Sequence, residues 1–356
     1  MTVQAGKHTY QEILTQGDAW DASLAAVEGQ ADVLGKWLRQ PCAEVLFTGC
    51  GSPYYLSLAA AAIWQALTGI RAHAVPASEL WLFPQSALPA QPSLLVAVSR
   101  SGATTEVLWG IDRYRERTHG RWLGVTCDID SELARRAPKV LVAKGGEEQS
   151  VVQTRAFTSM LVLTQAAAGL AAGRRDYMAA LCSLPRHVGR LIREYEPLAR
   201  SLAQAPGLTR FVFLGSGPNY GLACEAMLKM KEMSLAPSEA FHFLEFRHGP
   251  KSVIGQGTLL VGLLTEAARD REAAVLAEMR DLGATVLAVS ESADGLPADH
   301  TIALRSGIDE LARGALVLPV LQLLAYHRAL VNGLDPDRPA HLDAVVKLSA
   351  VTGKRA

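Results

Sequence analysis

The chain repeats one pattern at a constant offset, and this repeat constrains the fold more than any other feature. The apolar segment 44–48 runs into the glycine turn 49–51, and 166 residues further on the segment 211–214 runs into the similar turn 215–217. A glutamate follows each turn at the same offset. A lone G-x-G is weak evidence and two unrelated sheets could share it, but the matched downstream acid favours duplication of one α/β unit, with a boundary near residue 200.

Short apolar segments alternate with helical stretches in both halves of the chain. Such alternation is typical of an open, mostly parallel sheet with helices on both faces. We therefore expect an α/β protein with two tandem doubly wound, flavodoxin-like sheets. The predicted strands are 44–48, 70–75, 94–98, 122–126 and 140–143 in the first half, and 211–214, 259–264, 285–289 and 301–304 in the second.

The remaining segments complete the predicted organisation. Residues before 44 indicate a single long helix opened by a capping box, Thr9-Tyr10-Gln11-Glu12. Ala- and Leu-rich residues 150–205 predict a helical connector, and a long helix is expected near 310–331. The predicted division is 1–43 for an N-terminal helical segment, 44–200 for the first unit with its connector, 201–334 for the second unit and 335–356 for a C-terminal tail.

Composition excludes several function classes. The 356 residues carry 35 basic and 35 acidic side chains, so no net charge favours a nucleic-acid or membrane surface. The five cysteines are scattered without a C-x-x-C pair, and the first residues lack an apolar signal core. The apolar stretch Leu56–Ile70 is interrupted by polar residues and is too short to span a bilayer. We expect a soluble, cytoplasmic protein.

The stretch "VSRSGATTE", residues 98–106, predicts an anion-binding loop. It follows a predicted strand and opens a predicted helix, where free N–H groups and the helix dipole attract negative charge. Ser99, Ser101, Thr104 and Thr105 add hydroxyl groups, and Gly102 permits close backbone approach. One such residue would suffice as a helix cap. The absence of a P-loop lysine argues against a nucleoside triphosphate and indicates a monophosphate ester.

A second group of reactive side chains lies in residues 224–252. Glu225, Lys229 and Glu232 have helical spacing and share one face, although a solvated surface ion pair is the common outcome of such spacing. His248 precedes Gly-Pro at the tip of an element and is a candidate acid–base group or a structural histidine. No H-x-x-x-H or H-E-x-x-H occurs, so we expect neither a metal nor another cofactor.

Taken together, the two units, the S-x-S-G-x-T loop and the K-x-K-E helix followed by H-G-P resemble the sugar isomerase (SIS) family over about residues 9–345. The similarity is greatest to the tagatose-6-phosphate ketose/aldose isomerase and amino-sugar-6-phosphate deaminase group, and to the isomerase domain of glucosamine-6-phosphate synthase. The resemblance implies that Glu232 transfers the proton and that His248 opens the sugar ring from across a dimer interface. It implies that the phosphosugar is bound by Gly51, Ser52, Ser99, Arg100, Ser101, Thr104, Glu148, Gln153 and Lys229.

Two departures from the synthase limit what the resemblance implies. No glutaminase segment precedes the first unit, so we expect no glutamine-dependent transfer. The imine-forming lysine of the synthase falls on Ala344, with Lys347 three residues later. The expected function is isomerisation or deamination of a hexose or hexosamine 6-phosphate by acid–base proton transfer between C1 and C2, in a homodimer with shared active sites. The alternative is a non-catalytic phosphosugar sensor, although the expected single N-terminal helix argues against a DNA-binding regulator.

Overall fold

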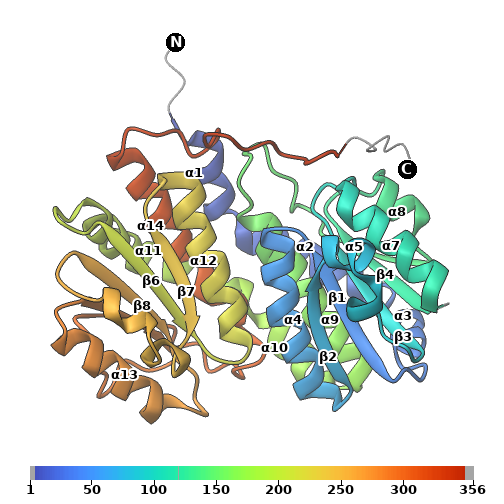
Figure 1. Ribbon diagram of the computed structural model, residues 1–356. Coiled ribbons are helices and arrows are strands. Elements are labelled where there is room, and N and C mark those ends of the chain that lie inside the picture. Colours follow the sequence, from blue (N-terminus) through green and yellow to red (C-terminus); the bar gives the residue numbers. More distant parts are fainter. Residues whose placement is uncertain (1–4, 119, 349–356) are drawn as a thin grey trace.

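Two five-stranded parallel sheets with the same strand order form the molecule, which a computed structural model describes over residues 5–118 and 120–348 (Figure 1). The first sheet has the order β2-β1-β3-β4-β5 and the second the order β7-β6-β8-β9-β10. This confirms the predicted doubly wound α/β fold. The first sheet comprises β1 (Glu44–Gly49), β2 (Arg71–Pro76), β3 (Ser93–Val98), β4 (Arg121–Thr126) and β5 (Lys139–Val142). The second comprises β6 (Arg210–Gly215), β7 (Ser238–His242), β8 (Thr258–Leu263), β9 (Thr285–Ser290) and β10 (His300–Ala303).

Strand β7 is the one strand of these sheets that the sequence pattern did not predict. Its sequence, S-E-A-F-H, has polar or charged residues at both ends and no apolar run. It pairs only with β6, at the edge of its sheet, where one side of the strand needs no partner. At the repeat offset of 166 residues, β7 is equivalent to β2, the edge strand of the first sheet. The duplication therefore indicates the position of β7 where the local sequence pattern does not.

Helices cover both faces of each sheet and also join the two units. Helices α4 (Ser52–Thr68) and α12 (Pro218–Ser234) are equivalent in the repeat, and both follow a glycine with positive φ, Gly51 at 60° and Gly217 at 52°. They lie side by side at the centre of the molecule (Figure 1). The other long helices are α7 (Thr105–Thr118), α9 (Arg155–Ala172), α10 (Arg175–Ser183), α11 (Pro185–Gln204), α13 (Arg269–Asp281) and α14 (Leu318–Val331). Short helices are α5 (Ala77–Leu82), α6 (Pro84–Ala87), α8 (Glu132–Arg136), η1 (Glu245–Arg247), η2 (Pro250–Val253) and η3 (Arg313–Val317).

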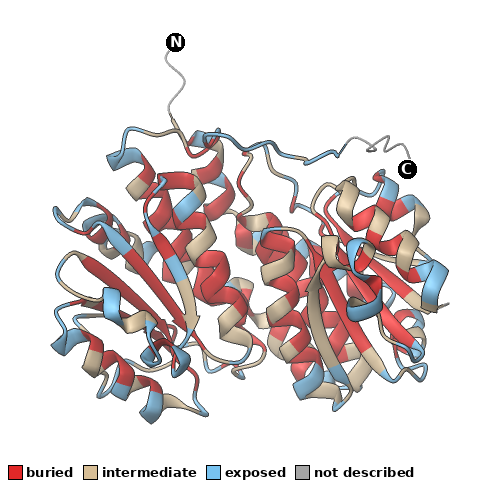
Figure 2. Ribbon diagram, viewed as in Figure 1, coloured by how far each residue is buried: buried red, intermediate tan, exposed pale blue. Residues whose placement is uncertain are grey.

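The N-terminal segment differs from its prediction. It forms three helices, α1 (Lys7–Leu14), α2 (Gln16–Glu28) and α3 (Ala31–Leu38), instead of one. The predicted capping box is wrong, because Thr9 and Glu12 lie inside α1 and bond to distant segments instead. These helices pack against the rest of the fold, since their apolar side chains belong to the same buried cluster as strands of both sheets. Figure 2 shows buried residues concentrated in the strands and the central helices of both units.

The segment Arg313–Val331, which contains η3 and α14, has the length and apolar composition of a membrane span. However, 83% of its most apolar window is buried inside the fold. It packs against α11 and α12, as a core helix does. The long helix predicted near 310–331 is present as the 3₁₀ turn η3 followed by the α-helix α14.

Candidate active site

A cavity of about 190 Å³ lies where the first unit, the second unit and the C-terminal segment meet. The turn after β1 and the loop after β3 contribute from the first unit, at the carboxyl ends of the strands, where doubly wound sheets bind ligands. Helix α12 contributes from the second unit. The lining residues are Cys50, Gly51, Ser52, Pro53, Arg100, Ser101, Thr104, Glu106, Val151, Gln153, Lys229, Glu232, Leu342, Asp343, Ala344 and Val346.

The structure therefore brings together eight of the residues predicted from the sequence. They are Gly51, Ser52, Arg100, Ser101, Thr104, Gln153, Lys229 and Glu232. Three other predicted residues, Ser99, Glu148 and His248, do not line the cavity.

The loop after β3 has the geometry of an anion site. Ser101 and Thr104 line the cavity directly before α7 begins, so the positive end of that helix lies at the cavity. Ser99 is buried beneath them, where its Oγ lies 3.0 Å from Thr104 Oγ1 and accepts a 3.1 Å bond from the Gly102 N–H. Ser99 thus shapes the loop. Gly102 has φ of +57°, and a Cβ there would lie 2.1 Å from Ser131 Oγ, so only glycine fits.

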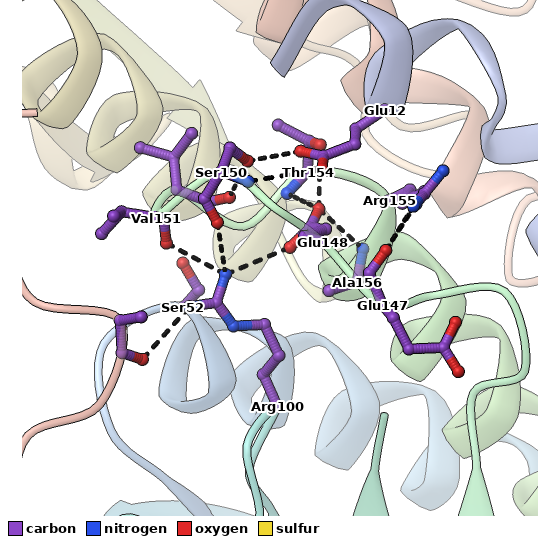
Figure 3. A network of polar contacts seen from close by, with 12 residues as sticks. Glu12, Ser52, Arg100, Glu147, Glu148, Ser150, Val151, Thr154, Arg155 and Ala156 are labelled. Atoms are coloured by element: carbon purple, nitrogen blue, oxygen red, sulfur yellow. Dashed lines mark hydrogen bonds and ion pairs between the residues drawn. The ribbon is translucent and has the colours of Figure 1, made fainter. Parts of the chain in front are cut away.

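Arg100 directs its guanidinium away from this loop and into the protein (Figure 3). Its Nη1 donates to Glu148 Oε2 at 3.2 Å and to the Val151 carbonyl at 2.9 Å, and its Nη2 donates to the Ala344 carbonyl at 3.1 Å. Only 12% of the side chain is exposed. Although Arg100 borders the cavity, these donors are already used by protein acceptors.

Glu148 lies behind the cavity wall with its side chain fully buried. Its Oε1 accepts bonds from the N–H groups of Thr154 (2.7 Å) and Ala156 (3.1 Å), at the start of α9 (Figure 3). Burial raises the pKa of this carboxyl, and the positive charge of Arg100 opposes that rise. The structure thus places Glu148 among protein donors, and the predicted contact with sugar remains a prediction.

Lys229 and two glutamates of α12 form a buried charge cluster. Lys229 Nζ lies 2.5 Å from Glu232 Oε2 and 3.4 Å from Glu225 Oε1, and it donates to Ser52 Oγ at 3.1 Å. The side chains of Lys229 and Glu225 are 1% and 0% exposed, so the interpretation as a solvated surface pair is wrong. Glu232 is partly exposed and lines the cavity.

The cluster shifts the proton affinities of its members. Burial raises the pKa of Glu225 to about 8, against the lowering effect of Lys229. Burial alone would lower the pKa of Lys229, but Glu225 and Glu232 outweigh it and hold that pKa above its usual value. At neutral pH we therefore expect a charged Lys229 and a proton on Glu225.

Sequence reasoning missed some contributors to this site. The sequence pattern assigns Glu225 no role beyond its helical spacing. Its Oε2 has no hydrogen-bond partner among the described residues, which is unusual for a buried carboxyl. Glu106 lines the cavity and its Oε2 is also buried without such a partner. At the C-terminal segment, Ala344 borders the cavity, while Lys347 is exposed and does not line it.

His248 follows η1 on the surface of the second unit, where it is exposed and does not line the cavity of its own chain. Its backbone N–H donates to the Glu245 carbonyl at 2.9 Å. No group of three or more His, Cys, Asp and Glu side chains is placed to hold a metal ion in the part of the chain that the structure describes.

Comparison with known proteins agrees with this architecture. The model of the SIS domain matches twice, over residues 40–170 and 208–332. The chain belongs to the SIS domain family. These two matches correspond to the two sheets, so each repeat unit is one SIS domain.

Similar curated proteins include glutamine–fructose-6-phosphate aminotransferases. The protein of Methanothermobacter thermautotrophicus is 28% identical over 91% of this chain and 53% of its own length. That of Symbiobacterium thermophilum is 31% identical over 84% of this chain and 51% of its own length. The chain thus spans about half the length of these relatives.

Solved structures of the SIS family cover the chain almost completely. A glucosamine-6-phosphate deaminase from Thermotoga maritima is 30% identical, with a TM-score of 0.78, over 96% of this chain and 100% of that one. A putative tagatose-6-phosphate ketose/aldose isomerase from Clostridium novyi has a TM-score of 0.89 at 24% identity, over 98% of this chain and 96% of that one. The second similarity supports the fold alone.

Proposed function

We propose that this chain transfers a proton between C1 and C2 of a hexose or hexosamine 6-phosphate. The observation that carries the proposal is that one cavity holds the anion loop of the first SIS domain and the carboxylate of Glu232 from the second. A ligand with a phosphate at one end and exchangeable protons at the other fits both features. The named activities of the Thermotoga deaminase and of the aminotransferases support this substrate class.

The phosphate would bind at Ser101, Thr104 and the first N–H groups of α7. These groups lie on a buried strand end and a helix start, so they are held in place before the ligand arrives. Binding at this remote group would fix the position of C1 and C2 and so reduce the entropy cost of the proton transfer.

Glu232 is the proposed general base. It is the carboxylate of the charge cluster that lines the cavity, and its side chain is partly exposed there. Lys229, held in place by Ser52 and Glu225, would stabilise negative charge that develops on the sugar oxygen of an enediol-like intermediate. Such chemistry requires no metal or redox cofactor.

The group on C2 would decide the product. If C2 carries an amine, proton transfer leaves an imine, which water hydrolyses with release of ammonia. If C2 carries a hydroxyl, the product is the isomeric aldose or ketose. His248 would open the sugar ring from the partner subunit of a homodimer, since its own chain places it away from the cavity. A cytoplasmic location and independence from glutamine belong to the same proposal.

The test is turnover of glucosamine 6-phosphate and galactosamine 6-phosphate without glutamine, with ammonia and ketose phosphate measured together. Glu232→Gln should lower turnover by about 10²–10⁴-fold while the phosphosugar still binds, as expected for loss of a general base. Glu239→Gln, an exposed position on β7, is the matched control. A Glu232→Gln variant with full activity would refute the assigned role. Phosphosugar binding by the unmodified protein, with neither ammonia nor an isomer formed, would identify a sensor instead.

A further inference from the structure

We propose that Arg100 is a positioning residue that joins two walls of the cavity, and that it does not hold the substrate phosphate. The inference rests on the proposed function only in taking the neighbouring loop as the phosphate site. It concerns a residue inside the S-x-S-G-x-T loop, where its place in the sequence suggests a phosphate ligand.

The hydrogen bonds of Arg100 point to this role. Nη1 donates to Glu148 Oε2, to the Val151 carbonyl and, at 3.4 Å, to the Ser150 carbonyl, all on one wall. Nη2 donates to the Ala344 carbonyl of the C-terminal segment, which forms another part of the cavity wall. A planar guanidinium with donors fixed in a fork is suited to such bridging, which a lysine ammonium could not reproduce.

The guanidinium of Arg100 is also paired with a carboxyl of the protein before a ligand arrives. This partner, Glu148, has a fully buried side chain, and its Oε2 lies 3.2 Å from Nη1. Glu148 is itself held by the N–H groups of Thr154 and Ala156, at the start of α9. The start of α9 therefore holds Glu148 in place, and Glu148 in turn holds the guanidinium of Arg100.

The C-terminal segment depends on the phosphate loop for its position. Its Ala344 carbonyl is bonded by Arg100, and the Leu348 N–H donates to Thr105 Oγ1 at 3.1 Å. Arg100 and Thr105 flank the loop residues Ser101 and Thr104. At its other end the segment is held by Asp337, which accepts a 2.7 Å bond from the Thr9 N–H. Between these attachments, Leu342 and Asp343 line the cavity.

The variant Arg100→Gln distinguishes a phosphate ligand from a positioning residue. A phosphate ligand would lose a charge-assisted bond, and the affinity for inorganic phosphate would fall by about tenfold or more. A positioning residue would leave the Kd for inorganic phosphate within about twofold, while kcat for the sugar phosphate falls by about 10–100-fold because the walls shift. In the second case amide hydrogen exchange in residues 338–348 should also accelerate.

The experiment measures three quantities on each variant: the Kd for inorganic phosphate by calorimetry, hydrogen exchange of 338–348, and kcat with KM. The variants are Arg100→Gln, Arg100→Lys, Glu148→Gln and the double variant Arg100→Gln/Glu148→Gln. The control is Arg113→Gln, which removes the arginine of an exposed ion pair on α7. Arg100→Gln leaves the buried Glu148 without its partner, which can destabilise the fold. The double variant also removes that carboxylate, so it separates this loss of stability from the loss of the bond to Ala344. Since Arg100 and Glu148 act as one unit, the double variant should be no worse than Arg100→Gln.

Retained phosphate affinity, faster exchange of 338–348 and failure of Arg100→Lys to restore kcat are the expected results. A tenfold loss of phosphate affinity with unchanged exchange would overturn the proposal, as would multiplicative effects in the double variant. If the unmodified protein binds no phosphate, the proposed function fails. The hydrogen-exchange comparison then still decides whether Arg100 holds the C-terminal segment.

Discussion

The buried carboxyl of Glu225 gives the fold a pH dependence that can be calculated. Its pKa rises from 4.5 to about 8 on folding, mainly because burial disfavours the charged form. The folded state therefore binds a proton that the unfolded state releases between these two values, so stability falls as pH rises through this window. Between pH 6 and pH 8 the linkage relation gives a loss of about 2 kcal/mol in the free energy of unfolding.

Glu225→Gln removes this titration but keeps the shape of the side chain and an oxygen that can accept from Ser52 and Lys229. The other partner of Lys229, Glu232, remains. The variant should therefore gain about 2 kcal/mol relative to the unmodified protein on going from pH 6 to pH 8. Urea unfolding followed by tryptophan fluorescence at both pH values measures the difference, with Glu239→Gln as control. A stability difference that stays constant between pH 6 and pH 8 would refute the argument.

Two further predictions concern glycines that the packing requires. Gly102→Ala places a Cβ 2.1 Å from Ser131 Oγ at a residue with φ of +57°, so it should cost more than about 1 kcal/mol and weaken the binding of inorganic phosphate. Calorimetry and urea unfolding check both effects, and unchanged phosphate binding would contradict the assigned site. Gly221→Ala places a Cβ 2.5 Å from the Tyr55 carbonyl, where α12 crosses α4, and should lower the melting temperature through overpacking. An unchanged melting temperature would show that the helices can separate at no cost.

The sequence predicted the elements that depend on local pattern. Nine strands, the two glycine turns and the loop at 99–104 lie where apolar runs and turn residues indicated. Strand β7 lacks such a pattern because an edge strand can keep exposed polar residues, here Glu239 and His242. The three N-terminal helices were read as one since helical periodicity continues across the breaks near residues 15 and 29–30.

The site was less predictable where it depends on tertiary packing. The spacing of Glu225 and Lys229 is the same for a surface pair and a buried pair, and the packing of α12 against neighbours such as α4 and α14 decides between them. The family resemblance implies that Arg100 binds the phosphosugar, and its place in the loop gives no sign of its contacts within the protein. Two of its acceptors, Glu148 and Ala344, are 48 and 244 residues away in the chain. Contacts over such distances leave no periodic signal in a single sequence.

The repeat offset also shows how the two units differ at their equivalent helices and loops. At the positions in α4 equivalent to the charge cluster of α12, the first unit carries Ala59, Ile63 and Ala66. The second unit has Thr265 where the first has Ser99, and the carboxylate of Glu272, equivalent to Glu106, accepts bonds from the Thr265 N–H (2.6 Å) and Oγ1 (3.1 Å).

Glu272 is only 1% exposed, and its carboxyl accepts from both the N–H and the Oγ1 of Thr265. These two donors of the second loop are therefore already used within the protein. Each unit thus retains one half of the arrangement: the first keeps an open anion loop, and the second keeps the carboxylates and the lysine. Because α4 and α12 pack against each other, the two halves meet in the cavity that contains Glu232.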